Sequence, residues 1–353
     1  MPFNPNYTIT SKIASVLMRI EALKETVNNL PITPRVLKTL RDTARLKSTH
    51  YSTQIEGNRL TEKEVALVLS GKESVSGRVR DEVEIKGYYA AMEWCEKNIQ
   101  RPLTETAIKT IHALVSGDGR KRVKPSPYRE GQNVIRNSVS GGIVYMPPEA
   151  KDVPSLMKEL VEWLNTSNAP VPISAAVAHY QFATIHPYYD GNGRTARLLT
   201  TLVLHKGGYG LKGVYSLEEY YARDLPAYYE AISRGEHHNC YFGRVEADIT
   251  PWLEYFIVGM LDSFEHVKKA AQEETGEDKS AALRSLSPKQ RKLLVLFNDA
   301  DTVTARDVEG LFGFSPRSAR LLCQQMVEEG FLIAVNPSDK ARRYGLAEKY
   351  IGI

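Results

Sequence analysis

Cysteine is scarce in this chain, and its scarcity excludes one common way of stabilising a fold. The sequence contains three cysteines, Cys95, Cys240 and Cys323, which are odd in number and far apart. A disulfide framework is therefore not expected. A cytoplasmic setting is the default expectation for a protein with this use of cysteine.

Long apolar runs and a strong charge of either sign are also missing. No stretch approaches the roughly 20 apolar residues of a membrane-spanning helix, and the first residues lack the pattern of a secretion signal. The formal net charge is +4, which does not by itself imply a nucleic-acid or membrane partner. With 353 residues and an ordinary apolar content, the chain is long enough for two or three globular domains.

One stretch, residues 186–197, brings several functional residue types into a single predicted turn. The segment before it is apolar at helical spacing, and Pro187 ends that predicted helix. Gly191 and Gly193 allow a tight turn with positive φ before a second helical run begins at Thr195. The sequence therefore predicts a glycine-rich turn that leads into the N-terminus of a helix.

The predicted turn has the properties of an anion site. Free backbone N–H groups and the positive end of the helix would both face it. Arg194 and Arg197 share one helical face, and two guanidinium groups beside such a turn suit a polyphosphate. Asp190 can hold Mg²⁺ against phosphate oxygens, and His186 can exchange a proton near neutral pH. Together these residues indicate phosphoryl or nucleotidyl transfer.

The same run resembles the active-site motif of the Fic family, His-x-Phe-x-(Asp/Glu)-Gly-Asn-Gly-Arg-x-x-Arg. Every polar position matches, and Tyr188 stands where phenylalanine is usual, so its hydroxyl must find a partner. The resemblance covers about residues 50–265. It implies a mainly α fold with a helical Fic core, and AMP transfer from ATP with His186 as the base and Asp190 as the Mg²⁺ ligand.

The resemblance also implies which residues bind the nucleotide. They are Gly191, Asn192, Gly193, Arg194, Arg197, Tyr228, Tyr229 and Asn239. The two tyrosines belong to a tyrosine-rich helical stretch, and such a stretch is more often part of a hydrophobic core.

Residues 50–58 form a second segment of interest. On spacing alone they read as a helix end and a turn, with Gly57 as the C-cap. Ser52-x-x-x-Glu56-Gly57 also resembles the Fic inhibitory motif, whose glutamate pairs with the second arginine of the active-site motif, here Arg197. A carboxylate on Arg197 would compete with the γ-phosphate of ATP and repel the incoming anion.

Residues 128–148 differ from the helical remainder. Two short β-prone runs, 134–136 and 143–145, flank a polar glycine-containing segment, which predicts a hairpin. Without the resemblance this hairpin could be ornamental. In the Fic family it is a flap that aligns a target segment by strand addition, and main-chain bonding of that kind does not identify the target. The target can include the chain itself.

We expect four parts: an N-terminal helical region with the inhibitory helix (1–100), a Fic catalytic core (101–268), a polar linker (269–284) and a last unit (285–353). The last unit reads as three helices and a hairpin, which resembles a winged helix-turn-helix. Five basic residues there could meet DNA phosphates: Arg317, Arg320, Lys340, Arg342 and Arg343. Three acidic residues dilute their charge, so protein contact is the equal alternative: Asp307, Glu328 and Glu329.

The leading interpretation is a protein adenylyltransferase that uses ATP and Mg²⁺ and is autoinhibited by Glu56. The kinase-like Doc branch typically has Asn-Lys-Arg where this chain has Asn192-Gly193-Arg194, which favours AMP transfer over phosphate transfer. Two alternatives stay open: a DNA-binding transcriptional regulator with a nucleotide-sensing Fic core, and an enzyme that removes AMP with Glu56 orienting a water. The target, the base preference and the oligomeric state, including a homodimer, stay open as well.

Overall fold

The structure is a computed structural model. It describes residues 3–30, 32, 34–71, 74–136, 141–235, 238–244, 246–275, 285–297, 300–336 and 342–350. The chain divides into two compact units: one comprises Met1–Glu25 and Thr43–His266, and the other comprises Thr26–Asp42 and Val267–Ile353. The first unit holds all the residues of the predicted active site, so most of the description concerns it.

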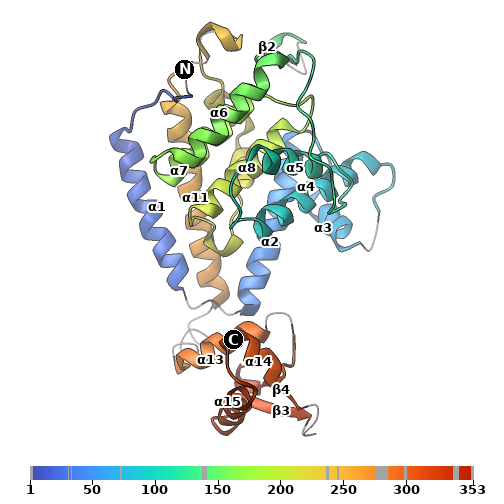
Figure 1. Ribbon diagram of the computed structural model, residues 1–353, viewed down its shortest axis with the longest axis vertical. Helices are drawn as coiled ribbons and strands as arrows, with labels where there is room; N and C mark the ends of the chain where they lie inside the picture. Colours follow the sequence, from blue (N-terminus) through green and yellow to red (C-terminus); the bar gives the residue numbers. More distant parts are fainter. Residues whose placement is uncertain are drawn as a thin grey trace. The chain divides into compact units, whose positions relative to one another are not determined.

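The first unit is built from helices and carries one small hairpin (Figure 1). Its helices are α1 (Ser11–Asn29), α2 (Pro34–Ile55), α3 (Glu62–Ser70), α4 (Val79–Lys97), α5 (Glu105–Val115), α6 (Val153–Thr166), α7 (Val171–Ile185), α8 (Asn192–Lys206), α9 (Glu218–Arg223), α10 (Leu225–Ile232) and α11 (Thr250–Thr275). Short helical turns are η1 (Ala150–Asp152), η2 (Leu211–Gly213) and the π-helical η3 (Cys240–Arg244). Strands β1 (Ile135–Arg136) and β2 (Ile143–Tyr145) pair antiparallel, which confirms the predicted hairpin. Helices α1, α2 and α11 each continue into the second unit.

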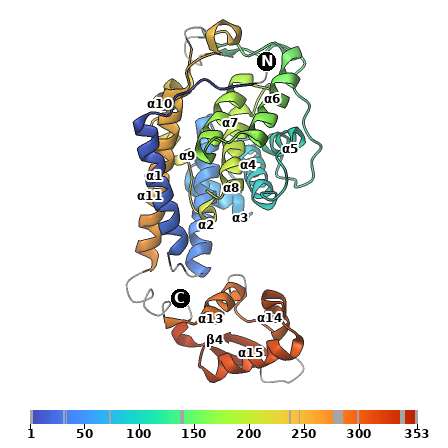
Figure 2. The ribbon, with the colours of Figure 1, turned by 60° about the vertical axis from the view of Figure 1, so that its left-hand side comes forward.

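Helix α7 lies at the centre of this unit and packs against α8 (Figures 1 and 2). It is apolar on every side, and most of its residues are buried, as expected for a helix that no solvent reaches. The run of small residues Ala175–Ala178 is buried and lets neighbouring helices approach closely. Helices α4, α5 and α6 complete a hydrophobic core with α7 and α8. The predicted motif is the connection between the two central helices.

The N-terminal tail and α1 run beside α11 (Figures 1 and 2). The Thr10 hydroxyl donates to Glu254 at 2.7 Å, and Arg19 pairs with Glu265 at 2.7 Å. Both acceptors belong to α11. The chain therefore joins its beginning to the helix that closes this unit.

Besides the ends of α1, α2 and α11, the described residues of the second unit form three further helices and an antiparallel pair of strands. They are α13 (Pro288–Leu293), the 3₁₀ turn η4 (Leu294–Phe297), α14 (Ala305–Phe312), α15 (Pro316–Glu328), β3 (Leu332–Asn336), β4 (Arg343–Leu346) and the 3₁₀ turn η5 (Glu348–Tyr350). The elements follow the predicted order, and their designation as a winged helix-turn-helix stays a prediction. Lys340 and most of the predicted linker, residues 276–284, lie outside the described residues.

Local sequence explains how these three helices begin. Ser287 and Thr304 each accept a hydrogen bond from the backbone three residues on and form capping boxes, and Ser315 accepts from Ser318. Behind the caps, buried side chains such as Val308, Cys323 and Phe331 form a core that is separate from that of the first unit.

None of the helices in the described parts of the chain combines the length and the apolar composition needed to cross a membrane.

His179 occupies the interface that α7 shares with α8 and α10. Thr200 donates to the Ala196 carbonyl, so its oxygen accepts the His179 Nδ1 proton at 3.1 Å, while Nε2 accepts from the Tyr228 hydroxyl at 2.9 Å. These contacts fit the neutral imidazole. Burial, together with a smaller contribution from the nearby Arg197 charge, lowers the pKa of His179 to about 3. The folded protein therefore keeps His179 neutral well below its ordinary pKa.

A neutral His179 makes stability depend on pH in a predictable direction. Below about pH 6.5 the unfolded chain protonates this histidine and the folded chain does not, so acid favours unfolding. Between about pH 7 and about pH 5.5 the unfolding free energy should fall by about 1.3 kcal/mol more in the parent protein than in His179→Gln. Urea unfolding at about pH 7 and about pH 5.5 measures both slopes. Equal slopes would show that His179 takes up its proton without unfolding.

Candidate functional site

The motif loop joins α7 to α8 through two residues in the left-handed region. His186 ends α7 with φ 49°, and Gly191 precedes α8 with φ 72°. The predicted positive φ is confirmed at Gly191 and wrong at Gly193, because α8 begins at Asn192 and not at Thr195. Gly193 lies in the first turn of the helix, where its backbone N–H is one of the unbonded donors of a helix N-terminus.

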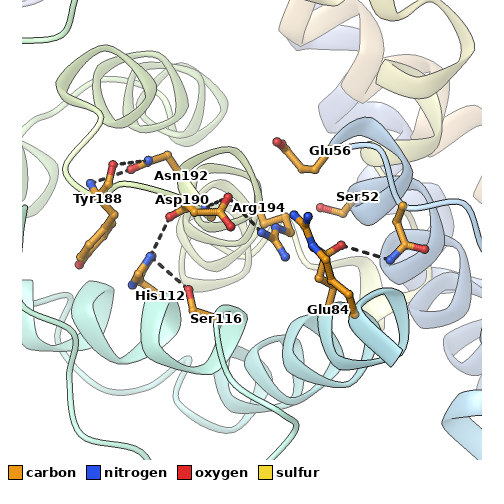
Figure 3. Close-up of polar contacts among 12 residues, drawn as sticks. Ser52, Glu56, Glu84, His112, Ser116, Tyr188, Asp190, Asn192 and Arg194 are labelled. Carbon is orange, nitrogen blue, oxygen red and sulfur yellow. Dashed lines mark hydrogen bonds and ion pairs between the residues drawn. The ribbon is translucent and has the colours of Figure 1, made fainter. Parts of the chain in front are cut away.

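Gly193 lies directly against the side chain of Glu56, so a side chain at position 193 would displace that carboxylate. A Cβ at Gly193 would stand 2.2 Å from Glu56 Oε1 and 3.2 Å from an Arg197 guanidinium nitrogen. The Glu56 carboxylate thus covers the N-terminus of α8 (Figure 3). That end of a helix attracts anions, so Glu56 occupies the position that a phosphate would take.

Arg197 is the buried centre of this arrangement. Its guanidinium donates through Nε to Ser52 Oγ and through Nη2 to the Ser52 carbonyl and to Glu56 Oε1, each at 2.8 Å. The Arg197 side chain is 1% exposed and that of Glu56 is 32% exposed. Burial by itself would lower the pKa of Arg197, but the charge and the hydrogen bond of Glu56, together with Tyr228 and Tyr88, outweigh it and the net shift is upward. The pairing of Glu56 with Arg197 is the one that the inhibitory motif implied.

Glu56 reaches this position because α2 ends at Ile55. Gly57 has φ 93°, which agrees with its predicted role in the turn after the helix. Asn58 then donates to the Asp81 carbonyl at 3.0 Å and to Glu84 at 3.2 Å, which joins the turn to α4 (Figure 3).

The hydrogen bonding and the burial of His186 favour the neutral form of its imidazole. Its Nδ1 lies 3.3 Å from the Ala183 carbonyl, so the ring proton resides on Nδ1 and Nε2 keeps its lone pair. Burial lowers the pKa of His186 to about 4, with smaller opposing contributions from Glu56 and Asp190. The imidazole is therefore unprotonated at neutral pH, which a general base requires.

Arg194 and Asp190 differ strongly in exposure. Asp190 is 78% exposed in its side chain, and Arg194 is 4% exposed with its Nη2 at 3.4 Å from Asp190 Oδ1. The Arg194 Nε has no hydrogen-bond partner among the described residues. A buried guanidinium with an unused donor supports an anion as its missing partner.

A cavity of about 420 Å³ lies beside Asp190 and is lined by His112, Arg129, Tyr188 and Tyr189 among others. No group of three or more His, Cys, Asp or Glu side chains that could hold a metal occurs among the described residues. One exposed carboxylate suits Mg²⁺, because this ion is commonly held by one or two carboxylates with substrate phosphates and water. The residues present therefore fit Mg²⁺ bound together with a nucleotide.

Asn192 fixes the motif loop from within. Its side chain accepts from the Tyr188 N–H at 3.0 Å and donates to the Tyr188 carbonyl at 2.7 Å (Figure 3). The oxygen and the nitrogen of the amide are thus each bonded to the Tyr188 backbone, and one of the two N–H donors is in use. The Tyr188 ring stacks on His112 with centroids 3.5 Å apart. Its hydroxyl has no hydrogen-bond partner among the described residues, so the expected partner is missing.

Two residues that the sequence reasoning missed hold the loop from outside. His112 Nε2 donates to the Asp190 carbonyl at 3.0 Å (Figure 3). Arg129 donates to the His186 carbonyl and the Gly131 carbonyl, each at 3.0 Å, and to the Pro148 carbonyl. Arg129 therefore joins the motif loop to both ends of the hairpin segment. Its only sequence signal is a lone arginine at the start of that segment.

The remaining nucleotide candidates are spread around the site. Tyr228 is 3% exposed and stacks on Tyr221 in the core, with its hydroxyl on His179. Tyr229 is 47% exposed, and its pKa is raised by burial and then by Glu56, which places it close to Glu56. Asn239 accepts from the Tyr241 N–H and bridges to Met146 just after β2.

Comparison with known proteins agrees with this geometry. Residues 102–204 match the model of the Fic/DOC family. The chain carries a Fic domain. It is 36% identical over 179 residues to the protein adenylyltransferase Fic of Drosophila mojavensis, an alignment that covers 49% of this chain and 34% of the relative. The chain thus spans about a third of the length of this curated relative.

Solved structures share the fold around the Fic domain. A Fic family protein from Desulfovibrio desulfuricans superposes with a TM-score of 0.62 at 24% identity over 98% of this chain and 99% of that chain. A Fic domain containing signaling protein from Bacteroides thetaiotaomicron gives a TM-score of 0.60 at 25% identity over 74% of this chain and 97% of that chain. The first likeness extends over nearly the whole chain and concerns the fold alone.

The two amide contacts of Asn192 give a test of how the Fic domain loop is held. In Asn192→Ala the buried Tyr188 N–H loses its acceptor, so the unfolding free energy should fall by about 1 to 3 kcal/mol. Asn133→Ala is the matched control, because Asn133 also donates to the Tyr188 carbonyl at 3.1 Å but leaves that carbonyl bonded to Asn192. Urea unfolding compares the two. Equal losses would mean that Asn192 is not the residue that holds the loop.

Proposed function

We propose that this protein is a protein adenylyltransferase that moves AMP from ATP to a hydroxyl side chain of a target protein and is autoinhibited by Glu56. The observation that carries the proposal is the Glu56 carboxylate seated on Arg197 over Gly193. The Glu56 carboxylate occupies an anion-binding position at the N-terminus of α8. The neutral imidazole of His186 belongs to the same site. The name of the Drosophila mojavensis relative supports adenylyl transfer as the reaction.

In the proposed reaction, Nε2 of His186 takes the proton of the target hydroxyl. The oxygen attacks the α-phosphorus of ATP, a new P–O bond forms, the bond to the β-phosphate breaks, and pyrophosphate leaves. Backbone N–H groups at the start of α8 bind phosphate oxygens, as do Arg194 and Arg197. Asp190 would hold Mg²⁺, which neutralises phosphate charge when it is bound.

The hairpin is the proposed docking site of the target. Ile143 and Val144 of β2 are exposed, and a target segment that pairs with the hairpin would bring its hydroxyl toward His186. Main-chain pairing accepts many sequences, so the target can be another protein or a second copy of this chain. The three cysteines, all within described residues, are buried and form no disulfide, which supports the cytoplasm as the proposed compartment.

Removal of the inhibitory carboxylate should release the enzyme. Glu56→Gly should increase the labelling of the protein itself or of a target by about tenfold or more when ATP carries the label at its α-phosphate. The reason is that the Glu56 carboxylate no longer competes with ATP for Arg197. His186→Ala should abolish labelling in either background, since no base remains. Label at the γ-phosphate should not be incorporated, which distinguishes AMP transfer from phosphate transfer.

Glu62→Gly is the matched control. Glu62 begins α3, whereas the described carboxylate partner of Arg197 is Glu56. No gain in Glu56→Gly, or a gain of equal size in Glu62→Gly, would contradict autoinhibition by Glu56. Release of AMP from a labelled target by the parent protein would instead favour the AMP-removing alternative, in which Glu56 orients a water.

We propose DNA binding by the second unit as an additional candidate function. Arg317 and Arg320 are exposed and three residues apart on α15, so they share one face. Two nearby acids are already engaged: Asp307 caps α14, and Glu329 accepts from Gln290 and Gln325. These hydrogen bonds come from neutral groups and leave both carboxylates charged, so contact with a protein stays the equal alternative.

The full chain should bind a random DNA duplex in a salt-dependent way. Each phosphate contact contributes about 0.9 to the slope of log affinity against log salt, so Arg317→Ala with Arg320→Ala should lower that slope by about 2. Lys12→Ala with Arg19→Ala removes the same charge from the first unit and is the control. DNA binding by the second unit would be contradicted if both double variants lowered the salt slope equally, or if the full chain bound no DNA at low salt.

A further inference from the structure

The end of α2 meets the rest of the first unit through three side chains at four-residue intervals. Ser48, Ser52 and Glu56 lie on one helical face because residues four apart are neighbours there. Ser52 and Glu56 both bind Arg197. Ser48 does not reach Arg197, and its hydroxyl donates to Glu218 Oε2 at 2.9 Å. The same face therefore carries an inhibitory contact and a second contact that the inhibitory motif does not include.

Glu218 is a buried carboxylate with a full set of hydroxyl donors. It is the first residue of α9 and is 3% exposed. Its Oε2 accepts from Ser48 at 2.9 Å and from Ser216 at 3.0 Å, and its Oε1 accepts from Tyr88 at 3.0 Å. The adjacent Glu219 differs, since it pairs with Lys47 in a partly exposed ion pair. A buried carboxylate without its hydrogen bonds is costly, so these donors are held in place.

Tyr88 is a second neighbour of Glu218 in the region of the inhibited arginine. Its hydroxyl donates to Glu218 Oε1, while Arg197 Nε donates to Ser52 Oγ. Burial and then the Glu218 charge raise the pKa of Tyr88, whereas Ser52 and the Arg197 charge act on that pKa in the opposite direction. Glu218 is thus bonded directly to α2 through Ser48, and its other partner Tyr88 lies close to the residues that form the inhibitory contact.

We propose that Glu218 is a positioning residue for autoinhibition, which holds α2 through Ser48 in the register that seats Glu56 on Arg197. The proposal rests on the proposed function. A shift by one residue rotates a helix by about 100° and moves it by about 1.5 Å, which is enough to take the Glu56 carboxylate off Gly193. Two partly exposed ion pairs, Arg45–Glu96 and Lys47–Glu219, also join α2 to α4 and α9, and Glu218 is the buried member of this set of contacts.

Ser48→Ala tests the proposal without removing a residue of the active site. It should raise labelling from α-labelled ATP by about three- to tenfold, because a hydrogen bond to a charged group is lost and Glu56 is seated less often. Thr49→Val is the matched control on the same helix. The Thr49 hydroxyl donates only to the Arg45 carbonyl one turn earlier, at 2.8 Å, so its removal should leave labelling unchanged.

A double-mutant cycle shows whether Ser48 acts through Glu56. In the Glu56→Gly background, Ser48→Ala should add nothing, since no carboxylate remains to be positioned. Glu218→Gln is a second variant that keeps the size of the side chain but cannot accept all three hydroxyls, and it should behave as Ser48→Ala does. An equal gain with and without Glu56 would overturn the proposal, as would labelling by Ser48→Ala at the parent level.

Hydrogen exchange separates this proposal from the proposed function. Backbone amides of residues 49–56 should exchange faster in Ser48→Ala and in Glu218→Gln than in the parent and in Thr49→Val. If Glu56→Gly shows no labelling at all, the proposed function fails, while exchange still reports whether Glu218 holds the helix. Unchanged exchange in both variants would overturn the positioning role whatever the labelling shows.

Discussion

The structure depends on the charge of one buried arginine. The Arg197 guanidinium is almost completely removed from solvent, and an ion in that position must be compensated by hydrogen bonds and an opposite charge. Ser52 supplies the hydrogen bonds and Glu56 supplies the charge. A phosphate group would supply the same charge from nearly the same place, above Gly193 at the start of α8. In the proposed function, inhibition by Glu56 and nucleotide binding are therefore two ways of compensating the Arg197 charge, and they would exclude each other because the carboxylate and the phosphate need the same space.

The need to compensate the Arg197 charge explains why many contacts of the first unit hold the short loop between α7 and α8 in place. Arg197 and Arg194 are placed by α8, and the start of α8 is placed by the turn that Asn192 closes on Tyr188. His112 and Arg129 hold the same turn by its carbonyl groups, from α5 and from the base of the hairpin. Backbone carbonyls have no chemistry in the proposed reaction, so these two residues act only through position. A catalytic loop held on several sides loses little conformational freedom when a substrate binds.

Sequence reasoning succeeded where the cause of a structure is local. Pro187 ends one helix, Gly191 allows the turn, and Thr304 starts α14, and each of these can be read within a few residues. The pairing of Glu56 with Arg197 spans 141 residues and was available only through the resemblance to a family motif. His112, Arg129 and Glu218 were missed because their contacts are long-range and their residue types are common in such segments. The positive φ expected at Gly193 was wrong, and the contact that distinguishes this position, with the Glu56 carboxylate, is one that no local rule contains.

The unequal exposure of Arg197 and Glu56 indicates how the proposed inhibition would be relieved. Arg197 cannot leave its site without burying an uncompensated charge, whereas Glu56 is partly exposed and regains hydration as soon as it turns toward solvent. Displacement therefore needs the movement of one side chain and not the unfolding of α2. Ser52 keeps its two contacts with Arg197 during that movement, because they come from the hydroxyl and the carbonyl of a residue one turn earlier. The guanidinium that a phosphate meets is thus already oriented by the helix that had blocked it.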